Sequence, residues 1–374
     1  MRRILIVAAI VAAGLAASVA LEASYLEEDE AAGEDVERLV PPPRPVPGNP
    51  LTDLIQRISV RPAYTYKGLT VFLLETPRVT DPTDYMTMTE ALERETLSIT
   101  EKGGGSVPVL LARNTGRRPV LMLAGEIVVG GKQNRTLRDD VLLPPRSDQV
   151  ELPVYCVEQG RWTGASMEFG TKSALAAPNV RAGAVQKRPQ AEIWASVSDY
   201  NASLGVQTAS GDLQTALDSE RVKEAQAEYR EAFGKHWRPR AVGMVIARWG
   251  RIVAADVFCN PGVFRKHRDR LLDSYVVDCI AFRRDAEEPD ERMPRAVPSP
   301  DDAARFLRRA LRAEFEWRST PGSGRLLDFS GRGISGAALV QKEHVLHACL
   351  LPDEVAPVIR EPRPLILQER QQGE

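Results

Sequence analysis

Two segments of the chain place a glutamate inside an apolar run and follow it with glycine and long polar side chains. In LAGEIVVGGKQNR the glutamate is Glu126, and in VELPVYCVEQGRW it is Glu158. A carboxylate among apolar residues needs a cation or hydrogen-bond donors, or it takes up a proton. We therefore take Glu126 and Glu158 as the candidate catalytic residues, able to act as a general base or to bind a ribose diol.

The side chains that follow these glutamates suit a ligand with anionic groups and a flat ring. Glycines let the backbone approach a ligand and expose N–H groups, and lysine and arginine neutralise phosphate. Glutamine and asparagine can hydrogen-bond a base or a ribose, and an indole can stack on a ring. The predicted ligand-binding residues are Lys132, Gln133, Asn134, Arg135, Gln159, Arg161 and Trp162.

A purely structural explanation fits the same residues. Glu126 would pair with Arg135 and Glu158 with Arg161, while Trp162 would lie in the core. The local chemistry leaves both explanations open.

Strand alternation predicts where the two glutamates lie. If residues 120–130 form one strand, one of its faces is lined by Val120, Met122, Ala124, Glu126 and Val128. The opposite face is also apolar, so this strand is expected to be covered on both sides and Glu126 to be at least partly buried. If it and the strand that ends at Glu158 are neighbours, their ends form one pocket.

The surrounding pattern predicts an α+β fold, with mostly antiparallel strands in the first half and helices then further strands in the second half. The first strands are LTVFLLE, LSITE, PVLLARN, DVLLP and VELPVYCVEQ, with a short helix at TMTEALERE. Helical periodicity follows from Gln190 to Phe233. Two strands meet at Gly250, helices begin near Pro261 and at a cap on Ser299 or Asp301, and FEWRST, RLLDFS, GAALVQ and HVLHACLL close the domain.

Other features of the sequence give weaker evidence of function. Asp256 and Asn260 end a strand as the two glutamates do, and we take them as second candidates for the same pocket. The basic run FRKHRDR, residues 264–270, has the pattern of a solvated helix face. GRGISG and EKGGGSVP are predicted turns between strands, and the histidines lack the spacing of a metal site, so no metal is expected.

The N-terminal segment has the pattern of an export signal. A basic MRR precedes an uncharged apolar stretch, Ile4 to Ala20, which ends in the small-x-small site SVA. We expect residues 1–20 to be a signal peptide and the protein to be secreted or periplasmic, with an uncleaved membrane anchor as the alternative. Residues 21–50 are expected to be an acidic and proline-rich spacer, 51–351 a single domain, and 352–374 a tail.

Composition excludes one class of partner. The 374 residues include 49 basic and 51 acidic side chains, which leaves no excess of positive charge for binding nucleic acid. Free buried thiols and disulfides are both compatible with the four cysteines, which are Cys156, Cys259, Cys279 and Cys349. The sequence indicates no particular cofactor and no oligomeric state.

Three motifs resemble a known family: EKGGGSVP (Glu101 to Pro108), GEIVVGGKQNRT (Gly125 to Thr136) and VYCVEQGRW (Val154 to Trp162). They are similar to the ARG-and-rhodanese-phosphatase-superfamily-associated protein domain, in which ARG stands for ADP-ribosylglycohydrolase. GRIVAADVFCN and LLDSYVVD extend the resemblance to roughly Leu51 to Leu351. The family is named for gene associations with NAD and ADP-ribose metabolism, so the resemblance implies a ligand of that type and no defined reaction.

These observations predict an exported protein that binds, and in the sharper form hydrolyses, a small phosphorylated nucleotide-like ligand of the NAD or ADP-ribose type. In that form Glu158 or Glu126 is the base, and the anion is held by Lys132, Arg135 and Arg161. The alternative is a non-catalytic cell-envelope interaction or structural module whose polar network only stabilises the fold.

Overall fold

The computed structural model describes residues 48–79, 81–104, 108–162, 166–282 and 296–353 and confirms the α+β class. The chain divides after Asn49, and every element named below belongs to the unit Pro50–Glu374. The predicted signal peptide, almost all of the predicted spacer and almost all of the predicted tail lie outside the described residues. No helix in the described ranges is long and apolar enough to cross a membrane.

A nine-stranded antiparallel sheet joins the first and last parts of this unit. Its spatial order is β1 (Ser59–Val60), β3 (Leu69–Glu75), β13 (Ala241–Arg248), β14 (Arg251–Phe258), β18 (His344–Leu351), β17 (Ile334–Gln341), β16 (Arg325–Gly331) and β15 (Glu314–Ser319), with β2 (Tyr64–Tyr66) paired to β3. Trp249 and Gly250 both have positive φ between β13 and β14, and Gly331 to Gly333 do so between β16 and β17. The turns predicted at Gly250 and in GRGISG are therefore confirmed.

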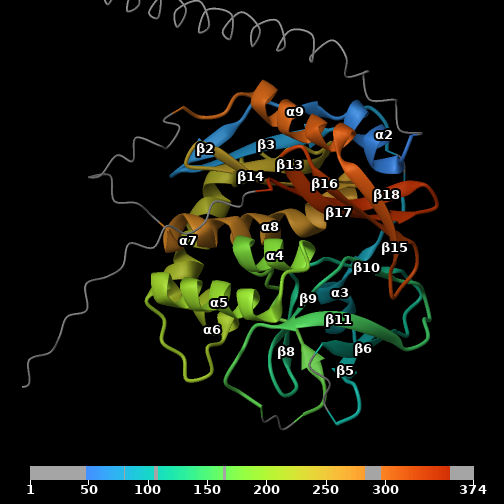
Figure 1. Ribbon diagram of the computed structural model, residues 1–374, viewed down its shortest axis with the longest axis vertical. Helices are drawn as coiled ribbons and strands as arrows, with labels where there is room; N and C mark the ends of the chain where they lie inside the picture. Colours follow the sequence, from blue (N-terminus) through green and yellow to red (C-terminus); the bar gives the residue numbers. More distant parts are fainter. Residues whose placement is uncertain (1–47, 80, 105–107, 163–165, 283–295, 354–374) are drawn as a thin grey trace, which may run out of the picture. The chain divides into compact units, whose positions relative to one another are not determined.

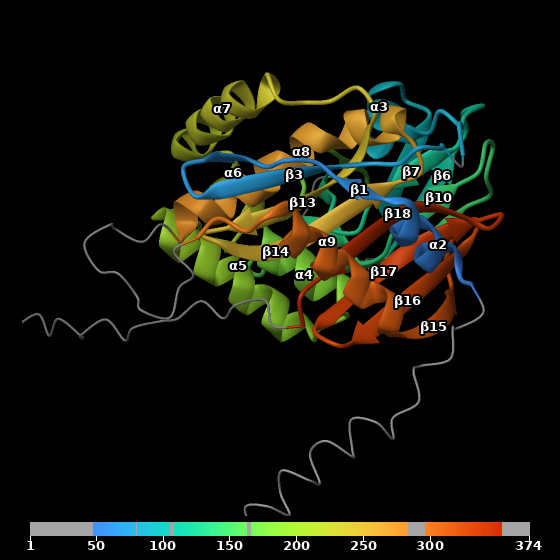
Figure 2. The same ribbon diagram turned by 90° about the horizontal axis from the view of Figure 1, so that it is seen from above.

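Helices cover both faces of this sheet (Figures 1 and 2). On one face lie α2 (Pro50–Arg57), α9 (Pro300–Arg309) and the 3-10 turn η1 (Ala310–Arg312); on the other lie α4 (Pro178–Val185), α7 (Glu220–Gly234) and α8 (Pro261–Ala281). Strand β3 shows the alternation directly, because Phe72 packs in the α2–α9 layer and Val71 in the α8 layer. Ser299 caps α9 through its side chain and Pro261 begins α8, as predicted.

Two smaller sheets, together with α3 (Met88–Glu93), enclose a second core. One has the order β12 (Phe169–Gly170), β8 (Ile127–Gly130), β9 (Arg135–Leu137), β11 (Val150–Cys156), β6 (Val109–Asn114) and β5 (Leu97–Glu101). The other has the order β10 (Val141–Leu143), β7 (Val120–Met122) and β4 (Met86–Thr87), in which β4 runs parallel to β7. The antiparallel β5–β6 pair confirms the hairpin predicted at EKGGGSVP.

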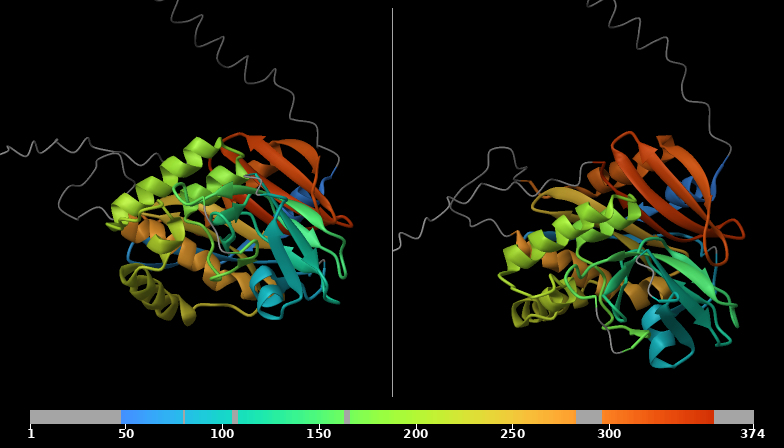
Figure 3. Two further views of the ribbon diagram at one scale, coloured as in Figure 1. Left: turned by 90° about the horizontal axis from the view of Figure 1, so that it is seen from below. Right: turned by 60° about the horizontal axis from the view of Figure 1, so that its bottom comes forward.

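The helical region predicted from Gln190 to Phe233 contains three helices: α5 (Gln190–Leu204), α6 (Leu213–Leu217) and α7. Helix α5 lies beside β11 and packs against α6 (Figure 3). The four cysteines are buried, and all are free thiols. Helix α4 was not predicted from the sequence.

The single strand predicted over residues 120–130 is wrong. Strand β7 ends at Met122, and β8 begins at Ile127 in a different sheet. Between them Gly125 has φ +92°, and a Cβ there would lie 2.6 Å from Cγ of Arg181, so only glycine fits this change of direction. The alternation rule fails at this point because it assumes continuously extended backbone.

Candidate functional site

The two segments that carry the predicted site are neighbours, as the sequence analysis required. Strand β9 pairs with β11, with Arg135 opposite Cys156. Just before β9, the backbone N–H of Asn134 donates to Oε2 of Glu158 at 3.0 Å. Nearby, Nε2 of Gln133 donates to the carbonyl oxygen of Gln159 at 3.0 Å. The KQNR and EQGRW segments therefore form one polar cluster, which we call the Glu158 network.

Glu158 is only 4% exposed, and both of its carboxylate oxygens accept hydrogen bonds. Oε1 accepts from Nε of Arg161 at 2.9 Å and from the hydroxyl of Ser210 at 2.7 Å, while Oε2 accepts from Nη2 of Arg161 at 2.7 Å. Burial by itself would raise the pKa of Glu158, but these donors and the Asn134 N–H outweigh it and lower the pKa. The pair Glu158–Arg161 is the one that the structural explanation predicts.

Arg161 and Asn134 hold the rest of this network together. Nη1 of Arg161 donates to the carbonyl oxygen of Gly131 at 2.8 Å, and Nη2 donates to Oδ1 of Asn134 at 3.2 Å. Nδ2 of Asn134 donates to Asp212 at 2.9 Å, and Asp212 caps α6. The guanidinium of Arg161 is thus committed to protein acceptors rather than presented to a ligand.

Arg135 is fully buried, and its predicted partner Glu126 does not contact it. Its Nη1 donates to the carbonyl oxygen and to Oε1 of Gln133, at 2.8 and 3.3 Å. Its Nε and Nη2, the edge that binds an oxyanion bidentately, have no partner among the described residues, and the same holds for Oε2 of the buried Glu101. Ordered water or a ligand normally satisfies such groups.

Lys132 and Trp162 lie at the surface of this cluster. The ammonium of Lys132 lies 5.0 Å from the centroid of the Trp162 ring, which is a cation–π contact. Trp162 is 46% exposed, so its predicted position in the core is wrong. An exposed indole beside a lysine remains available for stacking.

Glu126 lies in a different environment from Glu158. It is 1% exposed, and its carboxylate accepts from the backbone N–H of Leu123 at 3.0 Å and from Nη1 of Arg270 at 2.5 Å. Burial raises the pKa of Glu126, and the charge of Arg270 offsets this only in part. The carboxylate of Glu126 is therefore held by one long-range cation from α8.

Arg270 is itself held in place by two further contacts. Nη1 donates to the hydroxyl of Thr89 at 3.2 Å, and Nη2 lies 2.9 Å from Nδ1 of His267. Burial, followed by the charge of Arg270, lowers the pKa of His267, so the neutral ring accepts from the guanidinium. The solvated helix face predicted for residues 264–270 is wrong for His267 and Arg270.

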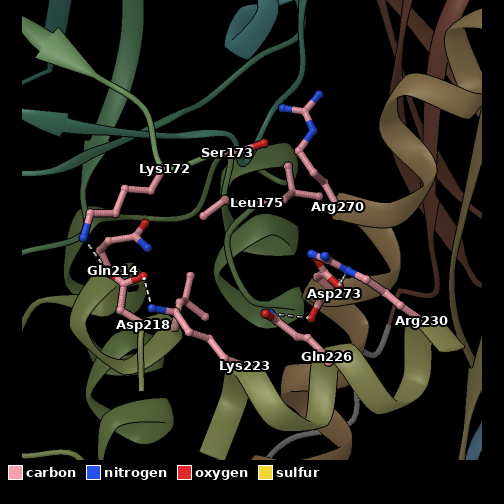
Figure 4. Close-up of a pocket in the computed structure, with 13 residues that line it drawn as sticks. Lys172, Ser173, Leu175, Gln214, Asp218, Lys223, Gln226, Arg230, Arg270 and Asp273 are labelled. Carbon is pink, nitrogen blue, oxygen red and sulfur yellow. Dashed lines mark hydrogen bonds and ion pairs between the residues drawn. The ribbon is translucent and has the colours of Figure 1, made fainter. Parts of the chain in front are cut away.

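A cavity of about 450 Å³ lies between the segment 172–175, α6, α7 and α8 (Figure 4). We call it the basic pocket, because its lining includes Lys172, Lys223, Arg230 and Arg270. Nζ of Lys172 and of Lys223 lie 2.6 and 3.5 Å from the same carboxylate, that of Asp218. Arg230 pairs with Asp273. No sequence motif marks this site, because its residues come from four separate segments.

Gln214 contributes a neutral amide side chain to the lining of the basic pocket. It lines the cavity, is 4% exposed, and has no hydrogen-bond partner for Oε1 among the described residues. Oε1 itself has almost no accessible surface, so this acceptor lies behind the wall of the cavity.

A third polar cluster surrounds Asp256, which was predicted to lie with the glutamates. Its carboxylate accepts from Nη2 of Arg181 at 2.6 Å, from the hydroxyl of Tyr275 at 2.9 Å and from Nε2 of His347 at 3.1 Å. Nδ1 of His347 donates to Asp140 at 2.6 Å. Burial would lower the pKa of His347, but Asp140 and Asp256 outweigh it and raise the pKa to about 9.

This buried cluster ties β14 and β18 to α4 and α8, and its charges neutralise one another. Asn260 also has a structural position, because its side chain caps α8 by accepting from the N–H of Val263 at 2.9 Å. The second candidates are therefore not part of the Glu158 network.

Comparison with known protein families gives a match over most of the chain. The sequence model of one protein family, the ARG and Rhodanese-Phosphatase-superfamily-associated Protein domain, matches residues 57–351. No curated protein and no solved structure matches the chain. The matched span contains the Glu158 network, the Glu126–Arg270 pair and the basic pocket. The chain therefore belongs to the ARG and Rhodanese-Phosphatase-superfamily-associated Protein domain family.

Proposed function

We propose that this protein binds a small phosphorylated, nucleotide-like ligand in the basic pocket. The observation that carries the proposal is the double position of Arg270, which lines the cavity and also pairs with the buried Glu126. A ligand phosphate that attracts Arg270 would therefore raise the pKa of Glu126. Among the described residues, Glu126 has no other cation within ion-pair distance. Binding and chemistry would be coupled through one side chain.

The charges of the basic pocket favour an anion. Lys172 and Lys223 share the single carboxylate of Asp218, so this corner of the pocket has one positive charge in excess. Lysine is a common phosphate ligand. A volume of about 450 Å³ suits a small molecule of nucleotide size.

Hydrolysis is the sharper form of this proposal, with Glu126 as general base. Glu126 does not line the cavity, so this form requires that Arg270 moves to the ligand and lets one water reach the carboxylate. A base works best when its pKa lies near the operating pH, and burial raises the pKa of Glu126 in that direction. We take ARG in the family name to stand for ADP-ribosylglycohydrolase, and on this proposal ADP-ribose and NAD are the first ligands to test. For Glu158 we propose a positioning role, since its oxygens are already occupied by Arg161, Ser210 and Asn134.

A second candidate function has its own support. The mutual saturation of Glu158 and Arg161 favours the non-catalytic alternative, a cell-envelope module whose polar network only stabilises the fold. The two functions differ in the expected effect of ligands. Only the first predicts that a phosphorylated compound stabilises the protein against heat.

The test is a calorimetric titration of the protein with ADP-ribose, NAD and inorganic phosphate. We expect saturable binding that Lys223→Met weakens by about tenfold, because one phosphate contact is lost. Lys235→Met is the matched control, since Lys235 is an exposed lysine at the end of the same helix, outside the pocket lining. Absence of binding by all three compounds, or equal affinities for the two variants, would contradict the proposal.

We also propose that the protein is exported. The support is the basic and then apolar pattern of residues 1–20. Intact-mass analysis of the protein from a cell-envelope fraction should give an N-terminus at Leu21. A mass that includes residues 1–20 would favour the membrane anchor instead.

A further inference from the structure

The nine-stranded sheet ends in an open edge at β15. Among the described residues, β15 pairs only with β16, and no other element forms a hydrogen bond with its backbone. Figure 2 shows β15 as the outermost strand on this side of the sheet. The N–H and C=O groups on the free side of such a strand can pair with another extended chain.

A cavity of about 360 Å³ lies beside this edge, between β15, β16, the start of β17 and the end of α4. We call it the acidic pocket, because the carboxylates of Glu314, Glu316 and Asp328 line it and Lys187 is the single cation in its described lining. Asp328 pairs with Lys187 and, at 2.9 Å, with Nε of Arg318. Glu314 and Glu316 are exposed and have no ion pair among the described residues.

Strand alternation places the two glutamates on the side of the sheet that carries the acidic pocket. Phe315, which lies between them, packs on the opposite side, in the α2–α9 layer. In the β15–β16 register Glu316 lies directly opposite Asp328, and like charges in such a position repel. Three carboxylates thus face two cations, Lys187 and Arg318, which leaves one negative charge in excess. A cation bound beside Glu316 would relieve this repulsion.

We propose that β15 binds an extended basic peptide, which adds to the sheet as a further strand and places a lysine or arginine in the acidic pocket. Main-chain hydrogen bonds to the open edge give affinity, and the carboxylates give selectivity for positive charge. On the opposite side of the strand, the exposed ring of Trp317 and the half-buried Phe315 favour apolar side chains. The favoured peptide therefore alternates basic and apolar residues. This site does not depend on the ligand proposed for the basic pocket.

The test is fluorescence anisotropy of the labelled peptide GKVKVKVG with the full chain, at low ionic strength because salt weakens contacts between exposed charges. We expect saturable binding. The peptide GEVEVEVG should not bind, because its charge is of the wrong sign. A GKVKVKVG peptide with methylated backbone nitrogens should not bind either, because it cannot pair as a strand. Spermidine carries positive charge without a peptide backbone and should not displace GKVKVKVG at equal concentration.

The double variant Glu314→Gln, Glu316→Gln should weaken the binding of GKVKVKVG by about tenfold, because two charge-assisted contacts are lost. Glu343→Gln is the matched control, since Glu343 is an exposed glutamate at the β17–β18 turn of the same sheet, outside the acidic pocket. Both replaced glutamates are exposed, so the variant should fold, and thermal unfolding verifies this. Failure of GKVKVKVG to bind the wild type would overturn the proposal. So would equal binding of the methylated peptide, displacement by spermidine, or equal affinities for the double variant and the control.

Discussion

Replacing Arg270 with methionine should leave the buried Glu126 carboxylate without its cation. The side chains of the two residues are 11% and 1% exposed, and their atoms approach to 2.5 Å. Removing one partner from such a pair typically costs about 3–5 kcal/mol, because the other charge stays buried. The N–H of Leu123 remains as a donor, so we expect the lower half of that range near neutral pH.

The loss of stability should depend on pH. Because the folded-state pKa of Glu126 is raised above its unfolded value of about 4.5, its contribution to stability is present below that pH and is lost as pH rises through the folded-state pKa. Removing Arg270 raises the folded-state pKa further. The Arg270→Met variant should therefore lose much more stability at about pH 8 than at about pH 5.

Urea unfolding of four proteins tests this reasoning: wild type, Arg270→Met, Glu126→Gln and the double variant. The double variant should recover most of the stability that Arg270→Met loses, since no buried charge remains. Arg265→Met is the control, because Arg265 is exposed on the same helix and should change stability by less than about 0.5 kcal/mol. Equal losses at both pH values, or a double variant no more stable than Arg270→Met, would refute the role assigned to Glu126.

Three further predictions use the same unfolding assay. Because the pKa of Glu158 is lowered, its contribution to the free energy of unfolding is present above about pH 4.5 and is lost as pH falls. Glu158→Gln should therefore destabilise the protein at neutral pH and progressively less in acid. Because the pKa of His347 is raised, its contribution to the free energy of unfolding is present below about pH 6.5 and is lost as pH rises through about 9. His347→Gln should abolish this decline in stability. Gly125→Ala should cost more than about 1 kcal/mol, because of its positive φ and the approach to Arg181, whereas Gly234→Ala, with open space around it, should not. Variants of Glu158 or His347 whose stability depends on pH as that of the wild type does would contradict these assignments. Equal effects of the two glycine variants on stability would contradict the role of Gly125.

Local signals in the sequence predict the elements well. Period-two alternation, the caps at Ser299 and Pro261, and the turn at Gly250 each depend on neighbours within a few residues. The strand over residues 120–130 fails because Gly125 turns the chain between two sheets that are both apolar. Hydrophobic alternation cannot detect such a turn when the sequence is apolar on both sides of it.

The candidate site was predictable only where its contacts are local. Glu158 and Arg161 are three residues apart, and the strand pair β9–β11 brings the remaining polar groups to them. The basic pocket has no such signal, because Lys172, Lys223 and Arg270 come from distant segments. Only the packing of the segment 172–175, α7 and α8 around the cavity brings these cations together.

The two glutamates met the same local criterion, a carboxylate within an apolar run, yet their surroundings shift their pKa values in opposite directions. Glu158 finds four donors near its own strand end, which lowers its pKa and leaves it no capacity for a substrate. Glu126 depends on a cation 144 residues away that also lines a cavity, and burial keeps its pKa high. A group that is fully satisfied within the protein fixes structure, whereas a group whose one cation can be drawn away by a ligand can respond to that ligand. On this ground Glu126, rather than Glu158, is the carboxylate to which a reaction should be assigned first.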